Sequence, residues 1–143
     1  MPNTLKNEKM ELNELYNLAE QNGIKVMDFC LPENKAVTLS TGDGCYVGVD
    51  PEVFGRECEE KVVLAHEMGH IATGGLYEVG TDKTSRKKQE ARAEKWAIDR
   101  LVPRDALKEA IKNGCSDIEG LAEHFSVPEE FMAQVLAYYS QKQ

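Results

Sequence analysis

The chain contains few histidines and no long hydrophobic run. Only three of its 143 residues are histidine, and no apolar stretch approaches the roughly 20 residues that a membrane-spanning helix needs. The N-terminus also lacks an apolar block between a basic start and a cleavage site of small residues, which is the pattern of a secretory signal. We therefore expect a cytoplasmic protein.

The chain also has no closely spaced cysteine pair, and it has fewer basic than acidic residues. Cys30, Cys45, Cys58 and Cys115 form no C-x-x-C pair, which excludes a zinc-ribbon pattern and a dense disulfide framework. They are expected to be reduced thiols; a redox or metal role is the alternative for Cys58 alone. Seventeen Lys and Arg against 25 Asp and Glu give a formal net charge of −8, which would repel phosphates. Direct binding of nucleic acid is not expected.

The pattern of apolar residues predicts a helix, a small sheet and then more helices. Apolar residues recur with a helical period from about 8 to 21, where Gly23 follows as a stop. Three short runs then favour strands, with Gly42-Asp43-Gly44 as a hairpin turn between the second and third. This order indicates an α+β fold. The strand runs are "IKVMDF", "AVTLST" and "CYVGV"; later helices are predicted over 56–73, 86–102, 104–113, 116–124 (capped by Ser116) and 128–140 (opened by Ser126 and Pro128), with a loop over 74–85.

Two of the three histidines stand four residues apart in "HEMGH". On a helix, His66 and His70 project from the same face and can offer imidazole nitrogens to one metal ion. Glu67 is rotated by about 100° from His66, so it can lie beside a reacting water instead of on the metal. The motif predicts a zinc site with Glu67 as general base; two histidines on a structural helix are the alternative.

A catalytic zinc site needs a third protein ligand. No histidine lies between His70 and His124, so the nearby candidates are carboxylates. In the helix predicted over 86–102, Glu90 and Glu94 each precede a residue of the apolar side by three positions, and both lean toward the face that should be buried. That apolar side is defined by Ala93, Trp96, Ala97 and Leu101.

Buried carboxylates on an apolar face need a compensating partner, which a zinc ion and its histidines would supply. We therefore predict Glu90 as the third ligand and Glu94 as the acceptor that holds a ligand histidine by its other ring N–H. The alternative is that both are rim-exposed acids paired with Lys87 or Lys95.

The motif resembles the gluzincin pattern of thermolysin-like peptidases, in which H-E-x-x-H is completed by E-x-x-x-D. Here Glu90 follows His70 by twenty residues, and Glu94 stands at the Asp position. "LAHEMGHIATG" and "EARAEKWAIDRLVP" are together similar to the ImmA/IrrE family of compact metallopeptidases, whose second helix has the form E-x-x-A-[ND]-x-[FW]-A and ends at proline.

The resemblance implies a zincin-like fold and a zinc-dependent endopeptidase, often encoded on prophages or other mobile elements, that acts on a helix-turn-helix repressor. We expect one domain over 1–143, made of an N-terminal helix and small sheet (1–50), the zinc-site helices (51–103) and a C-terminal helical cap (104–143). No segment of sufficient length remains for a DNA-binding domain, so the repressor is expected to be a separate chain. One zinc ion per chain is implied. The rival function is a regulatory module that holds zinc and sequesters its partner without cutting it.

Two further features bear on substrate binding. Tyr77, in the loop after the motif, is the first candidate for a donor to the oxyanion, with Tyr46 and His124 as alternatives. The strand "CYVGVD" directly precedes the motif helix, so its edge could pair with an extended substrate. The alternative for that strand is an internal position in the sheet.

Overall fold

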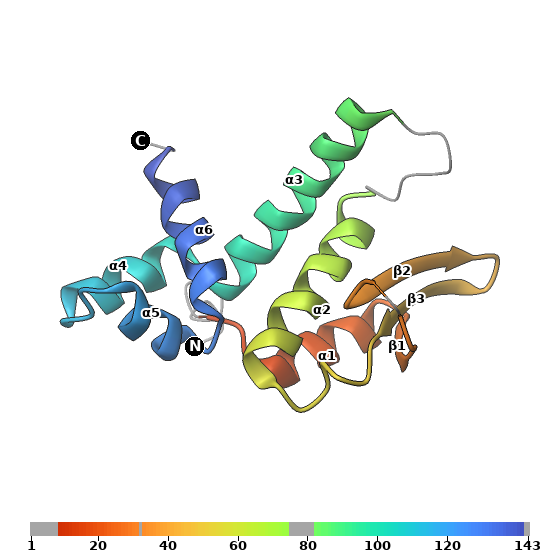
Figure 1. Cartoon of the computed structure of the whole chain (residues 1–143), viewed down its shortest axis with the longest axis horizontal. Coiled ribbons are helices and arrows are strands. Elements are labelled where there is room, and N and C mark those ends of the chain that lie inside the picture. The colour runs from red at the N-terminus through yellow and green to blue at the C-terminus, as the bar shows by residue number, and fades with distance from the viewer. Residues whose placement is uncertain (1–8, 32, 75–81, 142–143) are drawn as a thin grey trace.

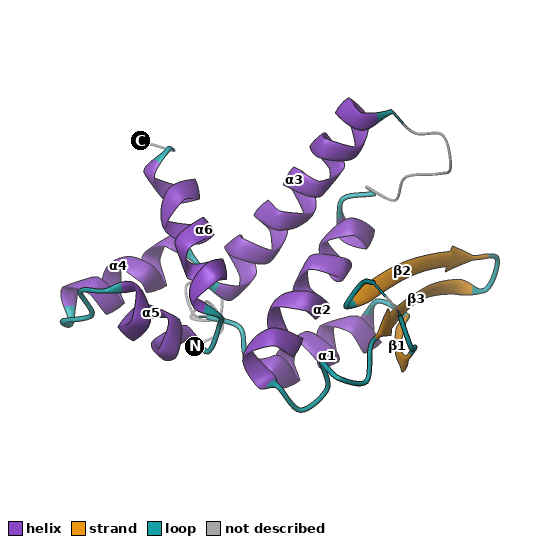
Figure 2. Cartoon of the chain, viewed as in Figure 1, coloured by secondary structure: helices purple, strands orange, loops and turns teal. Residues whose placement is uncertain are grey.

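A computed structural model describes residues 9–31, 33–74 and 82–141. Its six helices and three strands form an α+β fold, as the sequence predicts (Figures 1 and 2). None of the described helices combines the length and apolar character needed to cross a membrane. The elements are α1 (Leu12–Gln21), β1 (Ile24–Asp28), β2 (Ala36–Thr41), β3 (Gly44–Val49), α2 (Glu57–Ala72), α3 (Lys83–Leu101), α4 (Arg104–Lys112), α5 (Ile118–Phe125) and α6 (Glu129–Ser140).

The sheet is mixed and has the strand order β1-β3-β2. β3 pairs with β1 in parallel and with β2 in an antiparallel hairpin, in which Thr38 stands opposite Val47. The turn over 42–43 lies where Gly42-Asp43-Gly44 predicts it. β3 is thus the central strand, while β2 is an outer strand that pairs with no other described strand.

α2 lies at the centre of the molecule. The sheet lies on one side of it, and α3 with the C-terminal helices lies on the other (Figure 1). α2 buries Leu64, Ala65 and Met68, and it packs most extensively on α3, which buries Ala93, Ala97, Ile98 and Leu101. Burying these apolar side chains is the main stabilising contribution. It also brings one face of α2 against one face of α3.

Two charged residues at the start of α2 are buried and have partners. Glu60 accepts a hydrogen bond from the Tyr16 hydroxyl at 2.5 Å and another from the Gly55 N–H at 3.1 Å. Burial and the neighbouring Glu60 raise the pKa of Tyr16 well above its usual range. The Lys61 ammonium donates to the Phe125 carbonyl at 2.7 Å, and burial lowers its pKa. These contacts connect α2 to α1 and to the C-terminal end of α5.

Four helix ends differ clearly from the sequence predictions. α1 begins at Leu12 and not near residue 8, because Glu11 and Glu14 form a capping box there. α3 begins at Lys83, three residues early, because the Asp82 carboxylate caps it by accepting the Ser85 N–H at 2.8 Å. The cap of α5 is Asp117, which accepts the Gly120 N–H, and not Ser116. Ser126 ends α5 with a φ of 56° and does not open α6. In each case neighbouring residues can form the helix end by similar local hydrogen bonds, and the sequence does not specify which of them does so.

Candidate metal centre and its cleft

α2 carries the two histidines and the glutamate of the motif. Its first turn holds Glu57, Glu59 and Glu60, whose negative charge favours a helix N-terminus. His66 and Glu67 are half-buried, whereas His70 is buried. The rings of His66 and His70 meet edge to face, with centroids 5.0 Å apart. The i, i+4 spacing therefore places both imidazoles on one face, as the sequence predicts.

Glu90 on α3 faces both histidines. Its Oε1 lies 2.8 Å from His66 Nε2, and its Oε2 lies 3.0 Å from His70 Nε2. Ligand atoms of these three residues all lie within 4.8 Å of one another. The structure thus brings together the three residues that the sequence predicts as metal ligands, although Glu90 comes from a different helix.

The donor set fits a zinc ion. Two imidazole nitrogens and one carboxylate oxygen form one of the ligand sets used by catalytic zinc sites, which leave a fourth position open. Ligand atoms about 2.05 Å from a tetrahedral ion lie roughly 3.3 Å apart. The nitrogen-to-oxygen distances of 2.8 and 3.0 Å are a few tenths of an ångström shorter. A small outward movement of the Glu90 side chain would therefore suffice.

A glycine sets the spacing between α2 and α3 beside this site. A Cβ at Gly69 would lie 2.6 Å from the carbonyl oxygen of Ala93 and 3.0 Å from its Cα. The absence of a side chain at Gly69 thus allows the two backbones to touch one residue before His70 and three after Glu90. This close approach keeps Glu90 within reach of both histidines.

We expect Gly69→Ala to weaken zinc binding at least about tenfold, because ligand distances must be held within tenths of an ångström. The new methyl group meets backbone atoms, which cannot swing aside, so α3 must move away. Such overpacking costs about 1–3 kcal/mol, and the better helix propensity of alanine offsets about 1 kcal/mol of it. Zinc titration and urea unfolding measure both effects. Ala72→Ser, at an exposed position of the same helix, should change neither; wild-type zinc affinity in Gly69→Ala would contradict this role of the glycine.

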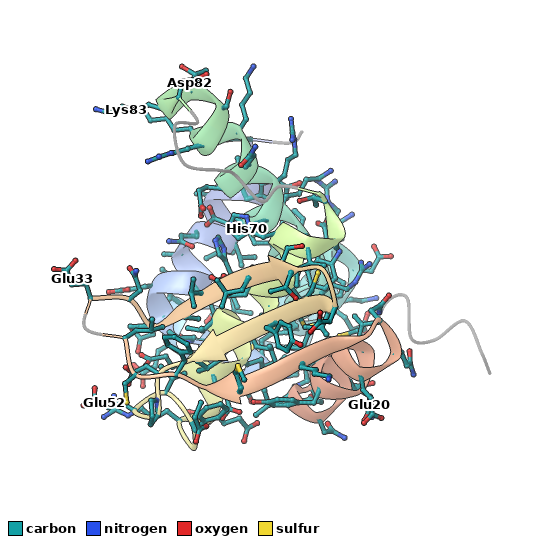
Figure 3. All side chains as sticks on the ribbon, turned by 90° about the vertical axis from the view of Figure 1, so that its right-hand side faces the viewer. Glu20, Glu33, Glu52, His70, Asp82 and Lys83 are labelled. Atoms are coloured by element: carbon teal, nitrogen blue, oxygen red, sulfur yellow. The ribbon has the colours of Figure 1, made fainter. Side chains whose placement is uncertain are left out.

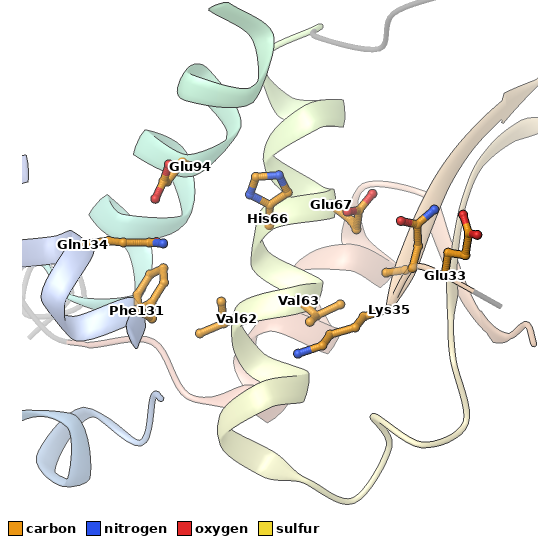
Figure 4. A pocket seen from close by; sticks show the side chains of 11 residues that line it. Glu33, Lys35, Val62, Val63, His66, Glu67, Glu94, Phe131 and Gln134 are labelled. Carbon is orange, nitrogen blue, oxygen red and sulfur yellow. The ribbon is translucent and has the colours of Figure 1, made fainter. Parts of the chain in front are cut away.

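A cleft of about 540 Å³ opens next to the metal site. α2 forms its floor, the segment leading into β2 forms one wall, and α3 and α6 form the other (Figure 4). Figure 4 shows Glu67 on the β2 side of His66 and Glu94 with Gln134 on the opposite side. The lining residues are Glu33, Asn34, Lys35, Ala36, Val62, Val63, His66, Glu67, Glu94, Phe131 and Gln134.

Thr38 is a residue of the site that the sequence does not predict. Its hydroxyl donates a hydrogen bond to Glu67 Oε1 at 2.5 Å, so the predicted general base has a partner on β2. Seen from the side of the sheet, β2 is the strand nearest to His70 (Figure 3). A threonine within a strand run carries no local signal of this contact, which depends on how β2 packs on α2.

The roles predicted for the other site residues are not confirmed. Glu94 lines the cleft, and none of the hydrogen bonds or ion pairs of the described residues joins it to a histidine, so its role in holding a ligand histidine stays a prediction. Tyr77 lies outside the described residues. Neither Tyr46 nor His124 lines the cleft; His124 packs edge-on against Phe125, with ring centroids 4.8 Å apart.

Of the two interpretations of the third strand, the internal position is confirmed and the free pairing edge is excluded. β3 is flanked by β1 and β2, so both of its edges are already paired. The position of this strand directly before the motif helix left a substrate-pairing edge possible, but the parallel pairing with β1 makes the strand internal. The outer strand next to α2 is β2.

Comparison with known protein families identifies a peptidase family. The family model described as the IrrE N-terminal-like domain, from a peptidase family, matches residues 55–137. This range contains α2 through most of α6, and with them His66, Glu67, His70 and Glu90. No curated protein matches the chain.

Proposed function

Since the chain belongs to the IrrE N-terminal-like domain family of peptidases, we propose that it is a zinc-dependent endopeptidase with His66, His70 and Glu90 as the metal ligands. The observation that carries the proposal is the convergence of these three side chains on one point, with Glu67 in the same cleft. One zinc ion per chain is proposed, and the compartment is proposed to be the cytoplasm.

Four residues at the metal centre have a defined task in this proposal. When bound, zinc supplies Lewis-acid chemistry, which polarises the scissile carbonyl and makes a water nucleophilic near neutral pH. The Glu67 carboxylate takes the proton of the attacking water and delivers it to the leaving amine. Three ligands converge among the described residues, His66, His70 and Glu90, and this set would leave one coordination position of a bound zinc ion open for this chemistry.

The shape of the site suits an extended peptide. The outer edge of β2 is unpaired by any described strand, so a substrate segment can add to the sheet through backbone hydrogen bonds. Val62, Val63 and Phe131 supply apolar lining for its side chains on the floor and the far wall. Backbone recognition with apolar side-chain contacts supports cleavage within a chain.

We propose a regulatory protein as the substrate, in particular a helix-turn-helix repressor of a prophage or other mobile element. This part rests on family membership. The acidic net charge of −8 is consistent with a protein partner and with no direct contact to nucleic acid.

The test is incubation of the zinc-loaded protein with the helix-turn-helix repressor encoded nearest to its own gene, in parallel with a digest of whole-cell protein, followed by mass spectrometry. We expect paired fragments whose masses sum to the intact chain plus one water, and their loss when a chelator is added. Binding of the repressor without any cleavage of repressor or peptides would instead favour a sequestering module.

A further inference from the structure

Thr38 lies in the middle of the outer strand and faces α2. Side chains alternate along a strand, so Thr38 points toward the helix while Val37 and Leu39 point to the other face of the sheet, where Leu39 is exposed. Its Oγ1 lies 2.5 Å from Glu67 Oε1 and 3.4 Å from the Glu67 carbonyl oxygen. The hydroxyl is thus directed at the end of the side chain that would act as base.

This contact restricts the orientation of the Glu67 side chain. Among the described residues it is the only hydrogen bond or ion pair of the Glu67 carboxylate. A glutamate has three rotatable side-chain bonds, whereas Thr38 is β-branched and is held in a paired strand opposite Val47. A single donor on a rigid element therefore selects one orientation of a flexible carboxylate.

The hydrogen bond also gives the two carboxylate oxygens of Glu67 different roles. A hydroxyl has one proton to donate, and Thr38 directs it to Oε1. Oε2 is then left without a described protein partner, in a side chain that lines the cleft. One oxygen is anchored and the other remains available to take a proton from water.

We propose that Thr38 is a positioning residue that holds Glu67 in its productive orientation for peptide hydrolysis. The inference rests on the proposed function, since it assigns a task to the same site. β2 would then serve both substrate binding and catalysis, because its outer edge can pair with the substrate and its residue Thr38 orients the base.

The first test compares Thr38→Val, which keeps the shape and removes the donor, with Thr38→Ser, which keeps the donor. The substrate is a quenched fluorescent peptide that spans a cleavage site found in the digest. We expect kcat of Thr38→Val to fall about 10- to 100-fold while KM stays within about twofold, because the variant loses a hydrogen bond to a charged group. Thr38→Ser should recover most of kcat. Ser40→Ala, two residues along the same face of β2, is the matched control and should behave as wild type.

The second test does not depend on cleavage. Acetohydroxamate is titrated into the cobalt-substituted protein and followed by the visible absorption of the metal, because a hydroxamate binds the metal and shares its proton with the catalytic carboxylate. We expect its affinity to fall about tenfold in Thr38→Val and in Glu67→Gln, and to be unchanged in Ser40→Ala and near wild type in Thr38→Ser. If Thr38→Val does not fold, Thr38→Ala replaces it.

The outcomes separate this inference from the proposed function. Wild-type hydroxamate affinity in Thr38→Val would overturn the positioning role, as would a wild-type kcat. If the wild-type protein cleaves no peptide while the hydroxamate affinities still follow the expected order, the proposed function fails and the orienting role of Thr38 stands. A rise in KM alone would indicate that Thr38 contributes to substrate binding and would also contradict the proposal.

Discussion

Replacing Glu67 by glutamine is expected to lower the rate of peptide cleavage by about 10²- to 10⁴-fold while zinc stays bound. Glutamine has the same size, and its amide oxygen can still accept the Thr38 hydroxyl, so the side chain keeps its place. It cannot take a proton from water. Because Glu67 is not one of the three converging ligands, the zinc content should be unchanged.

The matched control for this variant is Glu57→Gln, which removes one negative charge from an exposed position in the first turn of the same helix. It should cleave at the wild-type rate. Cleavage by Glu67→Gln at the wild-type rate would exclude Glu67 as the base. Equal effects of wild-type and Glu67→Gln protein on a bound but uncut partner would favour the sequestering module.

Replacing His70 by alanine is expected to abolish zinc binding at micromolar metal. His70 is the buried ligand, and its Nε2 lies 3.0 Å from Glu90 Oε2. Its loss leaves His66 and Glu90 as the remaining two of the three ligands, and Glu90 loses this contact. Zinc at about 1,000 times its dissociation constant stabilises the folded protein by about 4 kcal/mol, and the variant should lose this contribution. Its melting temperature should therefore no longer rise when zinc is added.

The third histidine provides the control variant, because it does not belong to the metal site. His124 is on α5, packs against Phe125 and does not line the metal cleft. His124→Ala should bind zinc and gain thermal stability from it as the wild-type protein does. A zinc-dependent melting temperature that survives in His70→Ala, or disappears in His124→Ala, would contradict the assigned ligand set.

Much of the metal centre follows from local sequence patterns. The i, i+4 spacing of His66 and His70 needs only a helix to place both rings on one face. Glu90 is predicted from a carboxylate that leans toward the apolar side of its own helix. The side chain is less buried than this pattern predicts, since 43% of it is exposed beside the two histidines. The structure adds what the sequence does not contain, namely that Gly69 and Ala93 let α2 and α3 approach closely enough for these residues to meet.

The features that escaped prediction depend on pairing between distant segments. The parallel pairing of β1 with β3 decides that β2, and not β3, is the outer strand next to α2. Thr38 reaches Glu67 only because this topology places β2 beside the helix. Neither the hydrophobic period of a strand nor its position before α2 specifies which strand it will pair with. The caps Asp82 and Asp117 were missed for a simpler reason, since neighbouring residues offered the same capping chemistry.

His66, His70 and Glu90 are proposed to hold one zinc ion for hydrolysis. The most direct test is the elemental zinc content of protein purified without chelators and without a histidine tag. We expect about one zinc per chain in the wild-type protein and in Glu67→Gln, and none in His70→Ala. A wild-type protein that holds no zinc, even after micromolar zinc is added, would exclude a zinc site at these residues and remove the basis for proposing a metallopeptidase.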